Sequence, residues 1–497
     1  MSPADTARMT IGGHAVDSPD RFVVIDPATE EPIGFAPDCQ PETLAGAVAA
    51  AEQAFPVWRA DDDARCDALR ACAAMLLSEA RTIAPLLTAE QGKPLASAHL
   101  EVVAAATWLS YYADLESEPT TLRDTPDSRV EVRRRPLGVV GAITPWNWPL
   151  VLATWKIAPA LRAGNTMVLK PSPFTPLSTL KMIEILNAGL PAGVLNSVSG
   201  LEPLGARLVD HPAVRKISFT GSTATGQKVA SAAAHQIKRV TLELGGNDPA
   251  IVLPDAEPEA VAEAIFWSAF ENSGQTCVAI KRVYVHESIH DELVELLAHL
   301  ASSVPVGPGC DPGVRLGPVS NRPQLDRVVE LVDDAVAAGG AAVAGGGRRP
   351  GRGYFFAPTI ITGIDNGVRL VDEEQFGPAL PIIKYRHTED AIARANGTSF
   401  GLGASIWTSD PVAAVPIAEQ LEAGMTWINQ HAAVTPDQPF AGVKSSGLGV
   451  ENGPWGLDEF TDIHVLSRTT LAAAEQQRQA IASAAQQLST GTAGATS

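Results

Sequence analysis

Cys277 is the side chain in this sequence best suited to nucleophilic chemistry. It ends the segment ENSGQTC, which follows the helical run AEAIFWSAF. The small polar residues before it favour a turn that exposes the thiol, and a thiolate is a strong nucleophile near neutral pH. The alternative is a buried cysteine that packs as a small hydrophobic side chain. Its neighbours in the fold must decide between the two interpretations.

Two further residues have side chains that could assist a nucleophile. Glu243 ends the apolar run in VTLELGG, where burial would raise the pKa of its carboxyl group and make it a better base at neutral pH. A capping or salt-bridged glutamate is the alternative. Asn147 lies in ITPWNWP, a rigid non-helical loop, and its amide can donate to a developing oxyanion. An asparagine that bonds to its own turn is the alternative there.

The surrounding pattern predicts an α/β fold with parallel sheets. From Gly138 onward, the short apolar runs GVVGAIT, NTMVLK, NSVSG and KISFTG each end in a polar or glycine-rich turn that leads into a helical stretch. RVTLELGG and PAIVLPD are further strands, and a second alternating region covers about 257–440. Strand–helix alternation of this kind indicates a doubly wound sheet.

The remaining segments differ in character. The first hundred residues should be mainly helical (42–58, 63–92 and near 99–115) after a short hairpin near 9–35. Residues 119–137 are polar, alternating and interrupted by Pro and Asp, which predicts an exposed β-ribbon. After Arg468 the chain is Ala/Gln-rich and then Ser/Thr/Gly-rich, which indicates a short helix followed by a flexible tail over 476–497.

Composition excludes several classes of function. A chain of 497 residues indicates two to three domains, and its net charge of −19 argues against nucleic acid or an anionic membrane as a partner. We find no secretory signal and no apolar stretch of membrane-spanning length. The five cysteines are scattered without zinc-site spacing, so we expect no metal and a cytoplasmic location.

Seven motifs, taken together, resemble the aldehyde dehydrogenase superfamily. ITPWNWP, KPS, FTGSTATG, LELGG, GQTC, EEQFGP and PFAGVKSSGLG occur in the order seen in that family, over about residues 20–466. The resemblance implies a Rossmann-like cofactor domain (1–118 and 138–247) and an α/β catalytic domain (248–445). It also implies a small β-ribbon element (119–137 and 446–475) that forms homodimers or homotetramers.

The same resemblance implies roles for the three candidate residues. Cys277 would attack an aldehyde to form a thiohemiacetal, and the oxyanion would be held by the Asn147 amide and the Cys277 N–H. A thioester would then remain on Cys277 until Glu243 activates water. Family members that transfer the acyl group to coenzyme A tend to lack this base, so we expect hydrolysis. A coenzyme-A-acylating semialdehyde dehydrogenase and a catalytically silent nucleotide-binding homologue are the alternatives.

The resemblance also implies a site for NAD, with NADP possible. FTGSTATG joins a strand to a helix, and the N–H groups of such a turn suit a pyrophosphate. Many NAD-preferring members have Glu where this chain has Pro173, which offers neither a bond to the ribose nor repulsion toward a 2′-phosphate. We therefore expect modest discrimination, with NAD ahead. The residues implied in cofactor binding are Thr144, Trp146, Lys170, Ser172, Gly221, Ser222, Gly226, Leu244, Glu374 and Phe376.

The substrate is the least constrained feature. Positions that line the family's substrate tunnel correspond to Trp148, Leu152, Trp155, Glu271, Thr276 and a loop from His431 to Gln438. The two tryptophans indicate an apolar or aromatic entrance. The absence of arginine among these positions weighs against semialdehydes that carry a carboxylate. Simple packing of the aromatic side chains is the alternative.

Overall fold

The fold was obtained as a computed structural model that describes residues 7–116 and 118–491. These residues form two compact units. The larger unit contains the described residues up to Asp114 together with Leu137–Phe460, and the smaller unit contains the described residues of 115–136 and those from Thr461 onward. Each unit is described separately below.

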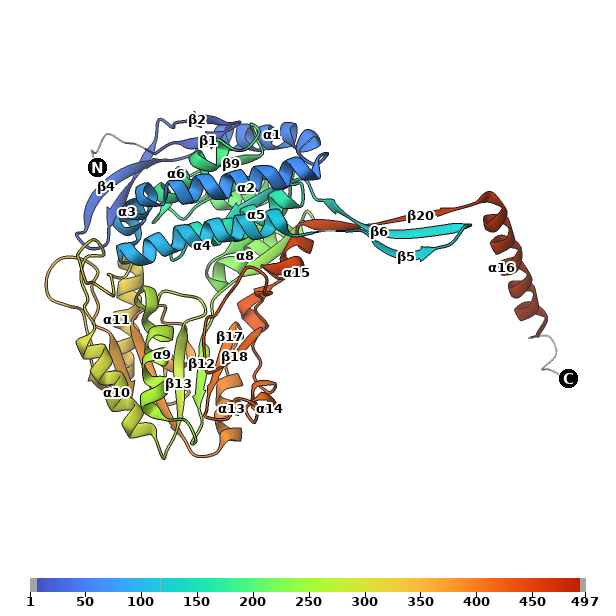
Figure 1. The fold of residues 1–497 in the computed structure, drawn as a ribbon. Coiled ribbons are helices and arrows are strands. Elements are labelled where there is room, and N and C mark those ends of the chain that lie inside the picture. The colour runs from blue at the N-terminus through green and yellow to red at the C-terminus, as the bar shows by residue number, and fades with distance from the viewer. Residues whose placement is uncertain (1–6, 117, 492–497) are drawn as a thin grey trace. The chain divides into compact units, whose positions relative to one another are not determined.

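The first sheet of the larger unit has six strands in the order β19–β11–β10–β7–β8–β9. Its edge strand β9 is labelled in Figure 1. All neighbouring pairs are parallel except β19, which is antiparallel to β11. The strands are β7 (Val139–Ile143), β8 (Thr166–Lys170), β9 (Leu195–Ser197), β10 (Val214–Thr220), β11 (Arg239–Glu243) and β19 (Gly447–Leu448). The helices that follow these strands are α5 (Pro149–Arg162), α6 (Pro176–Asn187), α7 (Leu204–Asp210) and α8 (Thr223–Ala234).

The second sheet has seven strands in the order β14–β15–β16–β13–β12–β17–β18, and only β14 runs antiparallel to its neighbour. Along β12, Ile251 packs in one apolar core while Ala250 and Val252 pack in another, so both faces of this sheet are covered. The strands are β12 (Asp248–Val252), β13 (Ile280–His286), β14 (Ala341–Ala344), β15 (Thr359–Thr362), β16 (Ala379–Tyr385), β17 (Gly403–Trp407) and β18 (Met425–Ile428).

Helices α9 and α10 contribute to one of these cores, and α11, α12 and α13 contribute to the other. Their bounds are α9 (Pro258–Phe270), α10 (His290–Ser303), α11 (Arg322–Ala337), α12 (Arg369–Asp372) and α13 (Thr388–Asn396). The shorter elements of this region are η1 (Glu271–Gly274), α14 (Val415–Ala418), η2 (Lys444–Ser446) and α15 (Gly453–Asp458).

The N-terminal part of the larger unit is mainly helical, as the sequence predicts. Two antiparallel hairpins come first: β1 (Met9–Ile11) with β2 (His14–Val16), and β3 (Arg21–Asp26) with β4 (Glu31–Pro37). The helices that follow are α1 (Pro41–Trp58), α2 (Asp62–Ser78), α3 (Ala80–Gln91) and α4 (Leu95–Asp114). Asp61 caps α2 by accepting from the Ala64 N–H at 3.0 Å, and α3 ends at Gly92 in the left-handed conformation (φ 99°).

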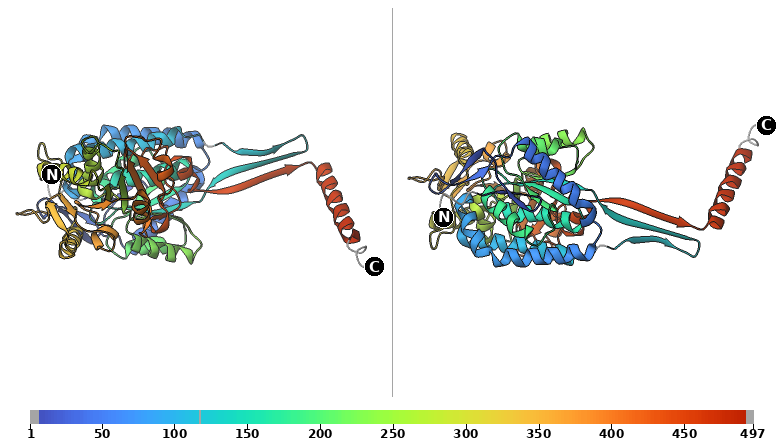
Figure 2. Two further views of the ribbon diagram at one scale, coloured as in Figure 1. Left: turned by 90° about the horizontal axis from the view of Figure 1, so that it is seen from below. Right: turned by 90° about the horizontal axis from the view of Figure 1, so that it is seen from above.

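The smaller unit contains the predicted β-ribbon. β6 (Ser128–Pro136) lies between β5 (Thr120–Asp124) and β20 (Thr461–Thr469) in an antiparallel sheet (Figure 2). α16 (Leu471–Gly491) follows β20, so residues 476–491 of the predicted flexible tail are helical, and residues 492–497 lie outside the described residues. Residues 446–460, grouped with the ribbon in the sequence-based division, belong to the larger unit.

Candidate active site

A cavity of about 220 Å³ lies at the carboxyl ends of strands in the first sheet. Asn147 follows β7, Gly221 follows β10 and Leu244 follows β11, and this edge of a parallel sheet is where ligands bind in such folds. Cys277 and Glu374 reach the same cavity from loops before β13 and β16. The lining residues are Pro145, Trp146, Asn147, Thr220, Gly221, Ser222, Leu244, Gly245, Cys277, Gln324, Arg327, Glu374 and Phe376.

The cavity brings together many of the residues singled out from the sequence. Two of the three candidate catalytic residues line it, Asn147 and Cys277, as do six of the ten implied cofactor residues, which are Trp146, Gly221, Ser222, Leu244, Glu374 and Phe376. Sequence reasoning missed Gln324 and Arg327, which reach the cavity from α11. Gln324 is held by donating to the Gln375 carbonyl at 2.9 Å, and Arg327 pairs with Glu373.

The turn before Cys277 has an unusual backbone that binds the opposite loop. Asn272 and Ser273 have positive φ values of 51° and 57° although neither is glycine. The Asn272 amide donates to the Asn147 carbonyl at 2.9 Å, and the Gln275 amide donates back to the Asn272 carbonyl at 2.8 Å. Hydrogen bonds of this kind compensate a strained turn and fix the position of the residue that follows it.

The environment of Cys277 disfavours ionisation of its thiol. Burial raises its pKa to about 12, Lys281 lowers the pKa, and the carboxylates of Asp248, Glu243 and Glu374 raise it further. A proton acceptor is therefore needed to generate the thiolate.

The Asn147 loop is fixed by a buried ion pair. Lys93 Nζ donates to Glu101 at 2.5 Å and to the Asn147 carbonyl at 2.8 Å, and neither charged side chain is exposed. The other carboxylate oxygen of Glu101 accepts from the N–H groups of Leu150 and Val151 in the first turn of α5. Glu101 therefore satisfies otherwise free N–H groups at that helix start while it holds the lysine beneath the loop.

Glu243 is fully buried at the end of β11, beside the cavity-lining Leu244. Within the described residues, neither oxygen of its carboxyl group has a hydrogen-bond partner. Burial raises its pKa well above the ordinary value, the negative charge of Glu451 adds to this, and Lys156 acts in the opposite sense. Lys156 donates to Thr220 Oγ1 at 2.7 Å and to Glu451. The raised pKa makes the Glu243 carboxylate a better proton acceptor than an exposed glutamate, as a general base requires.

Glu374 and Phe376 form one wall of the cavity. Glu374 accepts from the Gly246 N–H at 3.0 Å, and burial raises its pKa to about 7 while Lys281 lowers it. A Cβ at Gly245 would lie 2.5 Å from the Glu374 carboxylate, so a side chain at this position would displace that group. Phe376 packs edge-on against Trp146 with ring centres 5.3 Å apart.

The remaining implied cofactor residues lie near the cavity without lining it. Lys170 and Ser172 are buried at the end of β8, where Lys170 Nζ donates to the Pro171 carbonyl at 3.3 Å. The hydroxyl of Thr144 is buried without a partner among the described residues. Gly226, in the first turn of α8, packs so closely on Leu244 that a Cβ would lie 2.3 Å from its side chain.

None of the six predicted tunnel residues lines the cavity, but Trp148 and Thr276 lie next to residues that do. Trp148 is half-buried and donates to Thr276 Oγ1 at 2.9 Å, which connects the Asn147 loop to the residue before Cys277.

The other four tunnel residues differ in exposure. Leu152 and Trp155 are buried, Trp155 packs against Trp108 and Phe440, and Glu271 is exposed. The His431 side chain is buried, with its ring centre 5.0 Å from that of Trp427 and Nε2 3.5 Å from an oxygen of Asp248.

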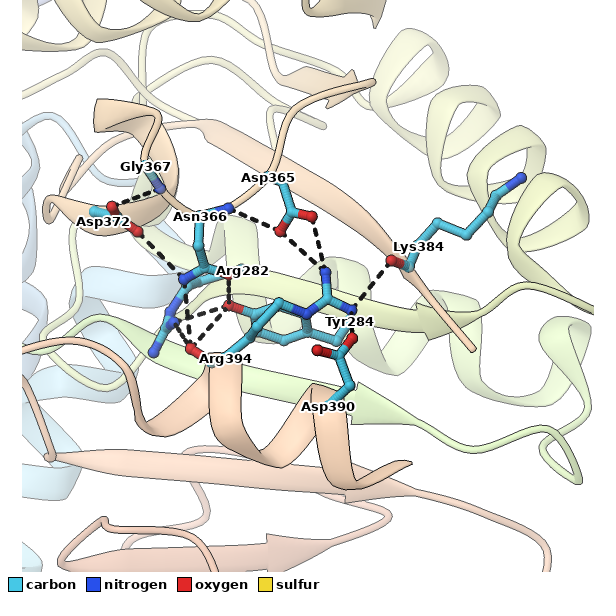
Figure 3. A network of polar contacts seen from close by, with 9 residues as sticks. All are labelled: Arg282, Tyr284, Asp365, Asn366, Gly367, Asp372, Lys384, Asp390 and Arg394. Atoms are coloured by element: carbon cyan, nitrogen blue, oxygen red, sulfur yellow. Dashed lines mark hydrogen bonds and ion pairs between the residues drawn. The ribbon is translucent and has the colours of Figure 1, made fainter. Parts of the chain in front are cut away.

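A polar network anchors β13, the strand that follows Cys277 (Figure 3). Arg282 donates to the Asn247 carbonyl at 2.9 Å, to the Ala395 carbonyl at 2.7 Å and to the Tyr284 hydroxyl at 2.9 Å. Tyr284 in turn donates to Asn366, and Arg394 on α13 pairs with Asp365 and Asp390. These bonds fix the start of β13 relative to β12 and α13.

Known proteins resemble this chain over nearly its whole length. The aldehyde dehydrogenase family profile matches residues 15–466. The chain is 41% identical to a phenylacetaldehyde dehydrogenase of Pseudomonas fluorescens, over 91% of this chain and 94% of that protein. It is 38% identical to an NADP⁺ succinate-semialdehyde dehydrogenase of Escherichia coli, over 91% of this chain and 94% of that protein.

A solved structure of an aldehyde dehydrogenase from Bacillus cereus in complex with NAD⁺ superposes with a TM-score of 0.91 at 34% identity, over 94% of this chain and 97% of that chain. The chain belongs to the aldehyde dehydrogenase family. The predicted family, the α/β fold with a Rossmann-like sheet and the NAD(P)-dependent oxidation of an aldehyde are confirmed.

Proposed function

We propose that this enzyme oxidises its aldehyde to the free carboxylic acid through a covalent thioester on Cys277, with Glu243 as the base that activates water. The observation that carries the proposal is the cavity, where Cys277 and Asn147 meet. The nearby carboxyl group of Glu243 acts on Cys277 and has no hydrogen-bond partner among the described residues. A nucleophile, an oxyanion donor and a base of raised pKa are the groups that acyl transfer through a thioester requires.

The residues present fit a dinucleotide. A Cβ at Gly221, Gly226 or Gly245 would press on the side chain of Phe219, Leu244 or Glu374 respectively, so glycine at these positions preserves the packing of the segments that line the cavity. Ser222 caps α8 by accepting from the Thr225 N–H at 3.3 Å, which places a helix start at the cavity edge for a pyrophosphate. Glu374 would hold the nicotinamide ribose, and Lys170 the adenine ribose. When bound, the nicotinamide supplies the hydride acceptor for the oxidation.

The protein groups then act in sequence. Cys277 loses its proton to a base, and its sulfur adds to the aldehyde carbon to form a thiohemiacetal. The Asn147 amide and the Cys277 N–H hold the oxyanion, and one such donor contributes about 3 kcal/mol to the transition state. After oxidation, the thioester remains on Cys277. Glu243 takes a proton from water, the hydroxide adds to the acyl carbon, and the Cys277 sulfur leaves with release of the acid.

The aldehyde we expect is apolar or aromatic. Trp148 lies between the Asn147 loop and Thr276, and Trp155 packs in an aromatic group with Trp108 and Phe440. None of the six residues assigned to the substrate tunnel is an arginine that could bind a substrate carboxylate. We therefore expect aromatic and aliphatic aldehydes to be better substrates than semialdehydes.

A panel of aldehydes tested with NAD and with NADP is the experiment for this proposal. We expect reduced nicotinamide to form with at least one apolar aldehyde. NAD should be preferred by less than about a hundredfold, equivalent to about 2.7 kcal/mol, because Pro173 neither binds the ribose nor repels a 2′-phosphate. Coenzyme A should leave the rate unchanged. Silence across the panel would contradict the proposal, and a rate that depends on coenzyme A would favour the acylating alternative.

We also propose a cytoplasmic homodimer or homotetramer, with a cofactor domain (1–118 and 138–247), a catalytic domain (248–445) and the ribbon as the assembly element. The free cysteines fit a reducing compartment. Within the described residues, no helix is long and apolar enough to cross a membrane. On β20, Ile463 and Val465 are 63% and 55% exposed, and exposed apolar side chains on one strand fit a subunit contact.

A further inference from the structure

Lys281 is a buried cation that the mechanism above does not use. It is the second residue of β13, and it is only 1% exposed. Its Nζ donates to the Thr276 carbonyl and, at 3.4 Å, to the Ala279 carbonyl. It also lies 5.5 Å from the centre of the Phe376 ring. Among the described residues it forms hydrogen bonds only to these carbonyl oxygens and no ion pair.

The position of Lys281 is fixed by its neighbour in the strand. Successive side chains of a strand point to opposite faces. Arg282 enters the polar network of Figure 3 on one face, so Lys281 is directed to the other, toward Thr276 and Cys277. A lysine that is held in place, buried and without a paired carboxylate is strongly disfavoured unless negative charge is present or develops nearby.

The negative charge near Lys281 develops when the Cys277 thiol ionises, and the charged groups around the thiol affect this step. Asp248, Glu243 and Glu374 all act against ionisation of the thiol, and Lys281 acts in its favour. Asp248, Glu374 and Cys277 are also the groups that act on Lys281 itself. The lysine therefore counteracts a set of carboxylates that would otherwise oppose formation of the thiolate.

The hydrogen bond to Thr276 adds a second effect. The Thr276 carbonyl and the Cys277 N–H belong to one peptide group. A cation bound to the carbonyl oxygen polarises that group and makes its N–H a stronger donor. In the proposed mechanism this same N–H holds the oxyanion, so Lys281 would stabilise both negatively charged states that form at Cys277.

We propose that Lys281 is a positioning residue that stabilises negative charge at Cys277, through its proximity to the thiol and through the Thr276–Cys277 peptide. The inference rests on the proposed function, because it takes Cys277 as the nucleophile. A different role, in which Lys281 only fills space in the core, predicts effects on folding and none on the ionisation of Cys277.

The test measures alkylation of Cys277 by iodoacetamide in the absence of substrate. The thiolate sulfur attacks the methylene carbon, an S–C bond forms and iodide leaves, so the rate follows the thiolate fraction. Peptide mass spectrometry follows Cys277 separately from the exposed Cys310, which serves as an internal reference. The rate is measured against pH in the wild type and in Lys281→Met, Lys281→Gln and Lys281→Arg.

We expect Lys281→Met and Lys281→Gln to slow alkylation of Cys277 about tenfold at neutral pH and to move its pH profile upward by about one unit. Lys281→Gln keeps a donor for the Thr276 carbonyl without the charge, and it carries the test if the Met variant does not fold. Lys281→Arg should restore most of the rate. The rate at Cys310 should not change in any variant.

The matched control is Lys384→Met on β16. Lys384 is a half-exposed lysine that pairs with Asp291 at 3.1 Å, and its side chain extends away from the network in Figure 3. Its removal should leave the Cys277 profile unchanged. The proposal is overturned if both uncharged Lys281 variants, folded as judged by Tm and circular dichroism, give the wild-type pH profile at Cys277.

The variant Cys277→Ala distinguishes a failure of the proposed function from a failure of the inference about Lys281. If Cys277→Ala retains aldehyde oxidation, the proposed function fails, whatever the alkylation data show. If Cys277→Ala is inactive while the Lys281 variants leave the alkylation profile unmoved, only the inference about Lys281 fails.

Discussion

At the scale of single residues, the site depends on burial that opposes ionisation. Cys277 and Glu243 both have raised pKa values because they are removed from water, and each lies in the field of further carboxylates. The raised pKa values favour the protonated form of both groups, so the catalytic form has to be generated by loss of protons. Catalytic groups often have pKa values that burial has shifted in this way, and they lose their protons within the site.

The pH dependence of the rate follows from the direction of these shifts. Because the pKa of Cys277 is raised to about 12 and that of Glu243 is raised as well, deprotonated forms become more populated as pH rises. We expect kcat/KM to increase between about pH 6 and 9 without an optimum near neutrality. The measurement is a profile of initial rates at saturating cofactor. A rate that falls over this range would contradict the assignment.

The candidate catalytic residues could be predicted from the sequence because each lies in a short motif at the end of a strand or turn. The order of the motifs around Asn147, Glu243 and Cys277 indicates their roles. The charged residues that support the site do not lie in motifs that indicate such a role. Lys93, Glu101 and Lys281 are buried, whereas charged residues usually lie at the surface, so a sequence alone offers no reason to place them near the site.

At the scale of elements, the loops around the cavity are held by groups that come from distant segments. The loop between β7 and α5 carries Asn147, whose carbonyl accepts hydrogen bonds from Lys93 and Asn272. Glu101 binds the N–H of Leu150, in the first turn of α5. Gln324 and Arg327 reach the cavity from α11, which has the pattern of an ordinary amphipathic helix. Whether α11 supplies residues to the cavity depends on how the two sheets pack together. The local sequence of the helix does not determine this packing.

Glu101→Gln tests the support of the Asn147 loop. The substitution leaves the Lys93 charge buried without its carboxylate partner, and breaking such a pair costs about 3 kcal/mol or more of unfolding free energy. Because Lys93 also bonds the Asn147 carbonyl, we expect kcat to fall together with Tm. Calorimetry and steady-state kinetics on the same preparation measure both.

The control for this variant is Glu184→Gln in the exposed pair with Lys181 on α6. Surface pairs contribute at most about 1 kcal/mol, so stability and kcat should stay close to the wild type. Equal losses in the Glu101 and Glu184 variants would show that the buried pair has no special part in holding the loop.

At the scale of the whole molecule, the ribbon was predicted from its polar alternation and its strand pairing is present in the structure. β6 pairs with the neighbouring strand β5 and with β20, which lies more than 300 residues later in the chain. A segment with so little core of its own has no obvious reason to persist in isolation, and this supports the proposal that it contacts another subunit. Its apolar side chains Ile463 and Val465 are the ones a partner would cover.

The double variant Ile463→Asp/Val465→Asp tests this assembly. Two charges on an apolar contact are strongly disfavoured when the contact forms, so we expect a shift toward monomer. Light scattering coupled to size-exclusion chromatography gives the mass directly. His464→Asp changes a neighbouring residue on the opposite face of β20 and should leave the assembly intact. An unchanged mass in the double variant would contradict the assignment of this surface.

The most direct test of the central claim is a single-turnover experiment on Glu243→Gln with a reactive aldehyde and NAD. If Glu243 releases an acyl group held by Cys277, the variant should lose steady turnover, keep a burst of NADH, and carry the acyl mass on the Cys277 peptide after rapid quenching. A variant that turns over at the wild-type rate, or that forms NADH without any acyl group on Cys277, would contradict the account.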